Sequence, residues 1–484
     1  MSEESLKTRA AKGLFWGGLS NGLQQIIGAV FGIIIMRILS PDDYGLTGML
    51  AIFTAIANTI LDSGFTTALI NRKEVKHEDY NAVFWFSLFA GILLYVILFF
   101  SAPFIAQFYD KPELISLSRF LFLSFLIGST GIAHNAILFK KMMVKERAKI
   151  DIAAVSVSSI IGLILALKGF AYWGLAIQTV SQTLMAVLLR WYFSPLKPTF
   201  SFHIAPLKEM FGFGSKLFAT NILGQINGNI FSILLGRFYT VEQVGYYSQG
   251  NKWMWMGLTT ITGMIGSVAQ PIFVEVREDI PRQLSVFRKM LRFGSFVSFP
   301  AMLGLAFVWE EFILLTVGEK WMDSIPFLQI LSVWGAFAYL STLYTNILIA
   351  YGKSNILFGG NMCIYVIQLI VVFAFFPLGI FPMIKAYVGC NIIGLFVWHY
   401  FVNKLIGIRI WEVLKDILPY LTITLGTFAV VWLITYNIEY IYMTLVLKIV
   451  LSIILYMIIM KATNSVIFKE SIQFLINSRK KNYE

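Results

Sequence analysis

The stretch Asn21-Gly-Leu-Gln-Gln-Ile-Ile-Gly28 returns 200 positions later as Asn221-Ile-Leu-Gly-Gln-Ile-Asn-Gly228. The likeness continues without a gap through residues 31–45 and 231–245, where Phe, Ile, Arg and Gly recur at equivalent positions. Each copy is an apolar run of helix length that carries a few amides and ends in a short polar turn. A membrane chain built from two similar halves is typical of transporters, in which the substrate site lies between the halves.

The composition of the chain places it in a membrane. Of its 484 residues 58% are hydrophobic and only 13% are charged, whereas a soluble domain carries about 25% charged residues. The net charge of +12 would suggest a nucleic-acid partner in a soluble protein. Here most of that excess follows from the Lys and Arg of cytoplasmic loops, and we expect no nucleic-acid partner.

Long apolar runs predict an all-α polytopic membrane protein with fourteen transmembrane helices, each about twenty or more residues long. We expect them at residues 13–36, 44–70, 81–105, 114–139, 150–167, 169–193, 211–236, 247–273, 287–309, 324–350, 355–376, 380–402, 417–436 and 441–460. Lys168 and Gly169 leave room only for a tight hinge between the fifth and sixth of these.

The repeat divides these spans into two pseudo-symmetric six-helix bundles plus two C-terminal helices. The predicted parts are an N-terminal lobe 1–193, a cytoplasmic linker 194–210, a C-terminal lobe 211–403, two extra transmembrane helices in 404–461 and a cytoplasmic tail 462–484. Lys and Arg gather in alternate loops, which predicts that both termini are cytoplasmic. Six spans return the chain to its starting side, so both lobes have the same orientation in the membrane. We therefore expect a pseudo-two-fold axis along the membrane normal to relate them.

A stripe of polar residues marks one face of the first span and of its repeat. Asn21 and Gln25 are followed on that face by Gly28 and Gly32, and the second copy has Asn221 and Gln225, with Asn227 beside them. Small residues and amides also hold membrane helices together, so two interpretations stay open. The duplication favours a stripe that lines a central cavity.

The second span carries an acid at a depth where a carboxylate is costly. Thr54, Asn58, Asp62 and Thr66 follow one another at a spacing of four residues. A charged group inside a span needs a cavity or a partner. We expect Asp62 and Asn58 to face the cavity, with Asp62 coupling transport to a cation or positioning a cationic partner. A buried ion pair or a helix-breaking turn at Ser63-Gly64 is the alternative.

Several cations lie in or near the spans. Arg119 and Lys252 are about a turn inside the outer face and are candidates for the cavity mouth, and Lys216 lies near the cytoplasmic entrance. Lys216 and Lys448 lie near span ends, where a long side chain can instead snorkel to the interface.

The sequence contains no Walker A motif and no Cys/His metal cluster, so we expect no enzyme, no cofactor and no metal centre. Without a nucleotide domain, the energy source is an ion gradient (H⁺ or Na⁺), the membrane potential or the gradient of the substrate itself.

Several segments together resemble the Wzx-type polysaccharide flippases, in particular their colanic-acid-exporter-like branch. The segments are Thr67–Lys73, Glu78–Phe86, Ala166–Gln178, Phe213–Asn221, Val244–Gly250 and Gly318–Trp321. The resemblance implies the fold of the multidrug/oligosaccharidyl-lipid/polysaccharide exporter superfamily. It also implies a bacterial inner-membrane location and the flipping of undecaprenyl-pyrophosphate-linked oligosaccharide for capsule, exopolysaccharide or O-antigen synthesis. The partners are then this lipid-linked substrate, membrane lipids and a coupling cation.

Two flippase-like alternatives share this fold: a cation-coupled multidrug exporter, for which twelve spans are expected, and a peptidoglycan-precursor flippase with fourteen. A membrane enzyme of polysaccharide assembly is a further alternative, although such enzymes usually have a large extracytoplasmic loop that this chain lacks.

Overall fold

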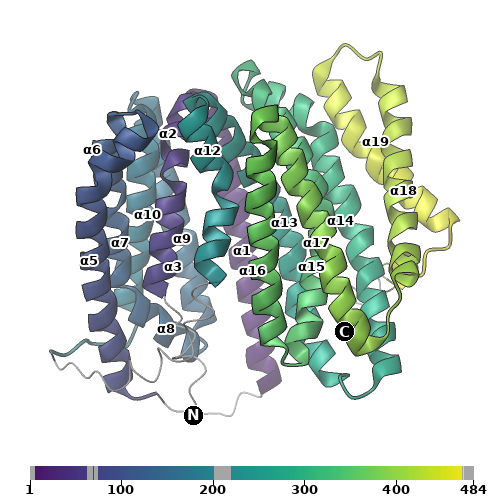
Figure 1. Cartoon of the computed structure of the whole chain (residues 1–484), viewed down its shortest axis with the longest axis horizontal. Helices are drawn as coiled ribbons and strands as arrows, with labels where there is room; N and C mark the ends of the chain where they lie inside the picture. The colour runs from purple at the N-terminus through teal and green to yellow at the C-terminus, as the bar shows by residue number, and fades with distance from the viewer. Residues whose placement is uncertain (1–5, 63–68, 70–74, 201–219, 471–472, 474–484) are drawn as a thin grey trace, which may run out of the picture. The chain divides into compact units, whose positions relative to one another are not determined.

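The structure is a computed structural model that describes residues 6–62, 69, 75–200, 220–470 and 473, with the side chains of residues 6–15 and of Asp62 excepted. All regular structure within those ranges is helical, as Figure 1 shows. This confirms the predicted all-α class.

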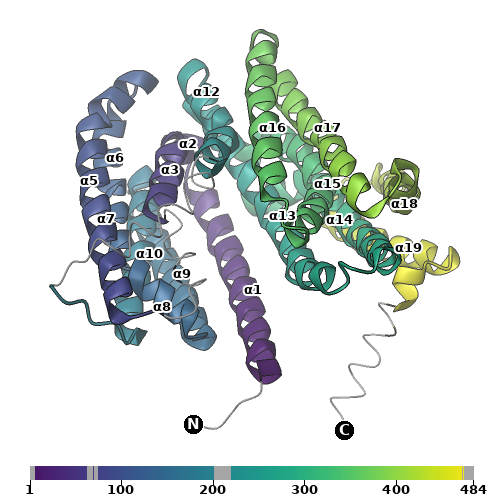
Figure 2. The ribbon, with the colours of Figure 1, turned by 60° about the horizontal axis from the view of Figure 1, so that its bottom comes forward.

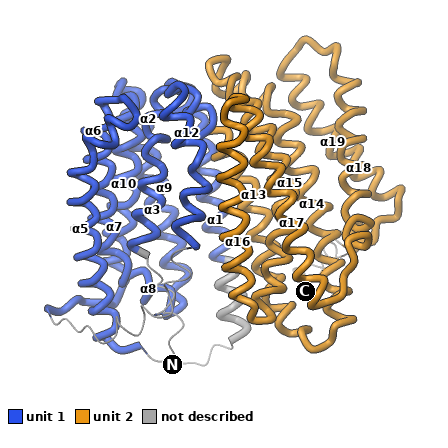
Figure 3. Tube along the Cα trace, in the orientation of Figure 1, with its two compact units in different colours: residues 1–248 blue, residues 249–484 orange. Residues whose placement is uncertain are grey.

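The chain forms two compact units, residues 1–248 and 249–484 (Figure 3). The helices that begin in the first unit are α1 (Leu6–Ile38), α2 (Pro41–Met49), α3 (Ala51–Asp62), α5 (His77–Tyr109), α6 (Glu113–Leu121), α7 (Leu123–Ser129), α8 (Ile132–Lys140), α9 (Val144–Leu167), α10 (Ala171–Phe193), α12 (Ile230–Phe238) and α13 (Val241–Glu275). Those that begin in the second unit are α14 (Ile280–Thr316), α15 (Ile325–Ala350), α16 (Ser354–Phe375), α17 (Ile380–Ile406), α18 (Ile410–Thr435) and α19 (Ile441–Ala462).

Eleven helices within the described ranges are long and apolar enough to cross a membrane, and two bent helix pairs raise the number to at most 13. The chain is therefore a multi-pass membrane protein. These candidates correspond to all of the predicted spans except 211–236, which begins outside the described residues. The total of fourteen stays a prediction.

Two predicted spans are bent rather than straight. Residues 41–61 bend by 40° and residues 113–140 by 44°. At the second bend the hydroxyls of Ser129 and Thr130 donate to the carbonyls of Leu126 and Ile127, at 2.8 and 2.7 Å. Such local bonds compete with the helical backbone ladder. The expected tight hinge between the fifth and sixth spans is confirmed, since α9 ends at Leu167 and Gly169 has φ of +78°.

In unit 1 the α1 helix runs beside α9, as Figures 1 and 2 both show. The α12 helix packs on α2, α3 and α5. A methyl group added at Gly236 would lie 2.7 Å from the Tyr109 ring. These contacts explain why unit 1 extends beyond the predicted lobe end at residue 193; the lobe boundaries themselves stay predictions.

The first part of the predicted linker is bound to α5. The Thr199 amide donates to the Asn81 side-chain oxygen at 2.8 Å, and the Trp85 indole donates to the Thr199 carbonyl at 2.7 Å. Residues 194–200 are therefore fixed to unit 1, while residues 201–210 lie outside the described part of the chain.

In unit 2 the α14 helix is the central element, packed against α15, α18 and α19. Its Gly294 lies against the ring of Tyr339, whose hydroxyl is 2.5 Å from that of Ser295. The two C-terminal helices, which fall outside the repeat, thus rest on α14 (Figure 1).

Candidate functional site

The polar stripe of α1 is open along its N-terminal half and packed along its C-terminal half. Asn21 is exposed, Gln25 is half-buried, and a methyl group added at Gly28 would meet nothing within 4 Å. Further along the same face Gly32 is buried. Gly28 is therefore not a point of close helix contact.

The second copy repeats this pattern of exposure. Asn221 is exposed, Gln225 is half-buried, Gly228 has no neighbour within 4 Å of an added methyl group, and Ser232 is buried. Asn227, by contrast, is 2% exposed and belongs to the packed side of its helix. Hydrocarbon is a costly environment for an exposed amide. That the exposed parts of both stripes line a water-filled cavity stays a prediction.

The remaining candidates are spread over both units. Asn58 on α3 and Lys252 on α13 are exposed. Lys216 and the side chain of Asp62 lie outside the described residues. Whether these groups share one cavity stays a prediction.

Arg119 has a local task that the sequence interpretation missed. Its Nε donates to the Phe99 carbonyl at 3.3 Å, and its guanidinium carbon lies 4.2 Å from the centre of the Phe99 ring. Four residues later α5 contains Pro103, which has no N–H to donate to Phe99. Arg119 thus satisfies an acceptor that the proline leaves open, and half-burial leaves it little freedom for a substrate.

The turns that follow the two repeated helices, predicted to lie on the outer side, pack reciprocally. A methyl group added at Gly45 would lie 2.0 Å from the Val241 carbonyl oxygen, and one added at Gly245 would lie 2.0 Å from the Pro41 carbonyl oxygen. Positions 41 and 241, like 45 and 245, are equivalent in the repeat. Such reciprocity is the mark of a local two-fold axis.

The caps of these turns are duplicated as well. Ser40 and Asp43 exchange hydrogen bonds of 2.9 and 3.3 Å at the start of α2. Thr240 and Gln243 exchange equivalent bonds of 3.4 and 3.3 Å at the start of α13. This capping box fixes both turns and thereby the position of Gly45 and Gly245.

A buried ion pair in unit 2 corrects the interpretation of Lys448. Its ammonium group does not snorkel to the interface but binds the carboxylate of Glu311, and both residues are 8% exposed. The same ammonium lies 4.7 Å from the centre of the Phe307 ring. No local pattern could reveal this pair, because α14 and α19 meet only in the folded chain.

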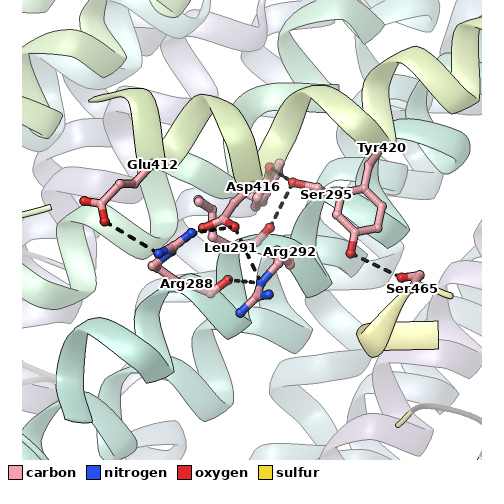
Figure 4. A network of polar contacts seen from close by, with 9 residues as sticks. Arg288, Leu291, Arg292, Ser295, Glu412, Asp416, Tyr420 and Ser465 are labelled. Atoms are coloured by element: carbon pink, nitrogen blue, oxygen red, sulfur yellow. Dashed lines mark hydrogen bonds and ion pairs between the residues drawn. The ribbon is translucent and has the colours of Figure 1, made fainter. Parts of the chain in front are cut away.

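A second ionic cluster joins α14 to α18 (Figure 4). The Asp416 carboxylate is 5% exposed and accepts two bonds from Arg288, at 2.7 and 3.1 Å. Arg292 approaches the same carboxylate at 3.7 Å, and Glu412 lies 3.5 Å from Arg288. Bidentate geometry of this kind is strong and directional.

An apolar groove of about 430 Å³ lies between the two ionic clusters, bounded by α14, α18 and α19. Pro300, Gly304, Phe428, Ile453 and Met457 are among the residues that line it. Lys448 borders the groove and contributes one of its few polar groups.

This helical architecture is shared with solved structures of transport proteins. The chain superposes on the lipid II flippase MurJ in its inward closed conformation with a TM-score of 0.75 and 15% identity, over 92% of this chain and 99% of that one. It superposes on a multidrug resistance MATE family transporter of the MOP superfamily, in an inward-facing conformation, with a TM-score of 0.63 and 16% identity, over 79% and 95% of the two chains. At such identities these likenesses define the fold.

Residues 34–326 match the family described as polysaccharide biosynthesis proteins, and the chain belongs to that family. The teichuronic acid biosynthesis protein TuaB of Bacillus subtilis (strain 168) is 28% identical, over 73% of this chain and 74% of its own. The lipopolysaccharide biosynthesis protein WzxC of Escherichia coli (strain K12) is 26% identical, over 74% and 73%. The resemblance to polysaccharide exporters is thereby confirmed.

Proposed function

We propose that this protein moves undecaprenyl-pyrophosphate-linked oligosaccharide across the bacterial inner membrane by alternating access, for the synthesis of a surface polysaccharide. Family membership supports the substrate class, since relatives are named for teichuronic acid and lipopolysaccharide biosynthesis. The fold supports the mode of action, because flippases and transporters share it.

The observation that carries the proposal is the matched exposure of Asn21, in a helix long and apolar enough to span a membrane, and of its repeat equivalent Asn221. Amides that only glued helices together would be buried against a neighbour. Exposed amides instead supply donors and acceptors to a polar substrate in a water-filled path. Sugar hydroxyls have the matching chemistry, and a lipophilic drug has fewer groups to use them, which places the multidrug exporter second.

Reconstitution of the full chain tests this function. Vesicles would contain the purified protein and an undecaprenyl-pyrophosphate oligosaccharide with a fluorescent sugar, and an impermeant quencher would report the outer leaflet. We expect faster exchange between leaflets than in protein-free vesicles, and slower exchange for the Asn21→Leu/Asn221→Leu variant. Exchange no faster than in protein-free vesicles would reject the function.

We predict that Lys252 compensates the charge of the pyrophosphate. A pyrophosphate carries at least two negative charges through a low-dielectric layer, which is costly without fixed cations. Lys252 is exposed on α13, whereas Arg119 is engaged at Phe99. Lys252→Ala should lower the transport rate by roughly tenfold or more, the factor that 1.4 kcal/mol supplies. Lys252→Arg should keep most of the wild-type transport rate. Equal transport rates for Lys252→Ala and Lys252→Arg at equal protein amounts would exclude charge compensation by Lys252.

Asp62 is the candidate for coupling transport to H⁺ or Na⁺. Its carboxylate is the titratable group of the second predicted span, and a charge at that depth requires a partner. We expect Asp62→Asn to keep normal expression but to remove the dependence of transport on an imposed cation gradient. Gradient-driven transport at the wild-type rate in this variant would contradict the assignment.

The proposed topology places both termini in the cytoplasm and both lobes parallel. In a background in which Cys363 and Cys390 are replaced, single cysteines at Arg37 and Arg237 should react with an impermeant maleimide from outside. Cysteines at Lys73 and Lys289 should react only after the membrane is permeabilised. Labelling of positions 37 and 237 from opposite sides would rule out parallel lobes.

A further inference from the structure

Pro300 leaves one carbonyl of α14 without its helical partner. A proline has no N–H, so the carbonyl four residues earlier, that of Phe296, receives no backbone bond. The Tyr456 hydroxyl of α19 donates to this oxygen at 3.0 Å. Tyr456 is 7% exposed, and both Phe296 and Pro300 line the apolar groove. In such surroundings an open carbonyl would be costly.

The first unit meets the same requirement in the same way. There Arg119 of α6 donates to Phe99, four residues before Pro103 of α5. The two sites use different donors on unrelated helices. In both, a neighbouring helix supplies the hydrogen bond that a mid-helix proline removes, which is how membrane helices tolerate proline.

The Phe296 ring, one turn before Pro300, contacts aromatic rings from α18, from α19 and from the segment after α19. The Phe296 ring stacks on Tyr456 at 5.7 Å and makes edge contacts with Tyr420 of α18 and with Phe468, each at 6.4 Å. Figure 4 shows the neighbouring Tyr420 reaching Ser465, beyond α19, with 3.4 Å between the hydroxyls.

Two ion pairs bracket this point along α14. Arg288 binds Asp416 of α18 eight residues before Phe296, and Glu311 binds Lys448 of α19 fifteen residues after it. At 1.5 Å per residue these separations are about 12 and 22 Å. One pair holds α18 near the start of α14, and the other holds α19 near its end. The hydrogen bond from Tyr456 to Phe296 lies between these two pairs, next to Pro300.

We propose that Tyr456 is a positioning residue that fixes the backbone conformation of α14 at Pro300, and that α18 and α19 together hold Tyr456 in place. Prolines bend helices because the ring crowds the preceding turn and the bond is lost. A fixed donor at the freed carbonyl selects one backbone conformation out of several. The two helices outside the repeat therefore define the shape of α14, on which the transport cycle of the second unit depends. This inference rests on the proposed function.

A double-mutant cycle between Tyr456 and Pro300 tests the inference. Tyr456→Phe keeps the ring and removes the hydroxyl. Pro300→Ala restores an N–H that can donate to the Phe296 carbonyl, so the Tyr456 hydroxyl is no longer needed as a donor. Tyr442→Phe is the matched control, because Tyr442 lies on the same helix and is 73% exposed. The readouts are transport at saturating substrate, the half-saturating substrate concentration, and amide hydrogen exchange of residues 296–304 in the full chain.

We expect Tyr456→Phe to speed amide exchange in residues 296–304 by about two- to tenfold, the range that one lost hydrogen bond supplies. The maximal transport rate should fall by a similar factor without a change in half-saturation. In the Pro300→Ala background the same substitution should change neither readout, and Tyr442→Phe should match the wild type.

Equal effects of Tyr456→Phe with and without Pro300 would overturn the inference, as would wild-type exchange and transport in Tyr456→Phe. A fall in transport that merely follows lost protein, with unchanged exchange, would overturn it as well. If the wild-type chain moves no lipid-linked oligosaccharide, the proposed function fails, whereas the exchange arm of the cycle still decides the role of Tyr456.

Discussion

Replacing Lys448 by Met should destabilise the protein by about 3–5 kcal/mol, the usual cost of leaving one member of a buried ion pair without its partner. Glu311 is 8% exposed, and the ammonium that it would lose lies against the Phe307 ring beside the apolar groove. The second carboxylate oxygen of Glu311 already has no hydrogen-bond partner, so loss of the ammonium leaves the whole charge uncompensated. Unfolding of the purified chain in mixed micelles, followed by tryptophan fluorescence, measures the change.

A second variant separates the ion pair from simple loss of packing. Glu311→Leu/Lys448→Met removes both charges and keeps similar volumes, and such exchanges are often neutral or stabilising. We therefore expect the double variant to recover most of the stability that Lys448→Met loses. Lys289 is the matched surface control, since its pair with Glu470 at 2.8 Å is largely exposed and should contribute little. A double variant as unstable as the single one would show that the charges are not the cause.

The fold could be predicted from the sequence because its signals are local. An apolar run of about twenty residues has few alternatives to a membrane span. The repeated residues 21–45 and 221–245 predict two similar halves, and the lobe boundaries stay predictions. The bends within residues 41–61 and 113–140 could not be predicted in the same way. A bend leaves the hydropathy of a segment unchanged, and the hydroxyl-to-carbonyl bond of Thr130 at the second bend depends on local geometry that hydropathy does not report.

For the site, the sequence repeat supplied candidate residues whose role stays a prediction. The duplication singled out Asn21 and Asn221, and the structure gives them the same exposure. For charged residues outside the repeat, the sequence shows the charge but does not identify the residue that pairs with it. Lys448 and Glu311 are 137 residues apart, and nothing in either segment indicates the other. For Arg119 a signal did exist in the sequence. Pro103 in the preceding helix has no N–H, so the Phe99 carbonyl lacks its helical donor, and an arginine on a neighbouring helix can supply one.

Replacing either Gly45 or Gly245 by Ala should prevent the turns that follow the two repeated helices from meeting. The added methyl group would lie 2.0 Å from a backbone carbonyl oxygen in each case, a distance that only movement of the backbone can relieve. Overpacking of this kind costs about 1–3 kcal/mol, which disfavours the joined state by roughly 5- to 150-fold. If transport requires these turns to meet and part, its rate should fall by a comparable factor.

The reciprocal geometry makes the prediction sharper. Gly45→Ala and Gly245→Ala each disrupt the same interface between the two turns, one substitution from each turn. Each should therefore have a similar effect, and the double variant should be little worse than either single variant. Gly389→Ala is the control, because a methyl group there meets nothing within 4 Å. Transport in vesicles at equal protein amounts measures all four variants. A strong effect at one glycine and none at the other would contradict the two-fold relation, because the same turn-to-turn contact carries both.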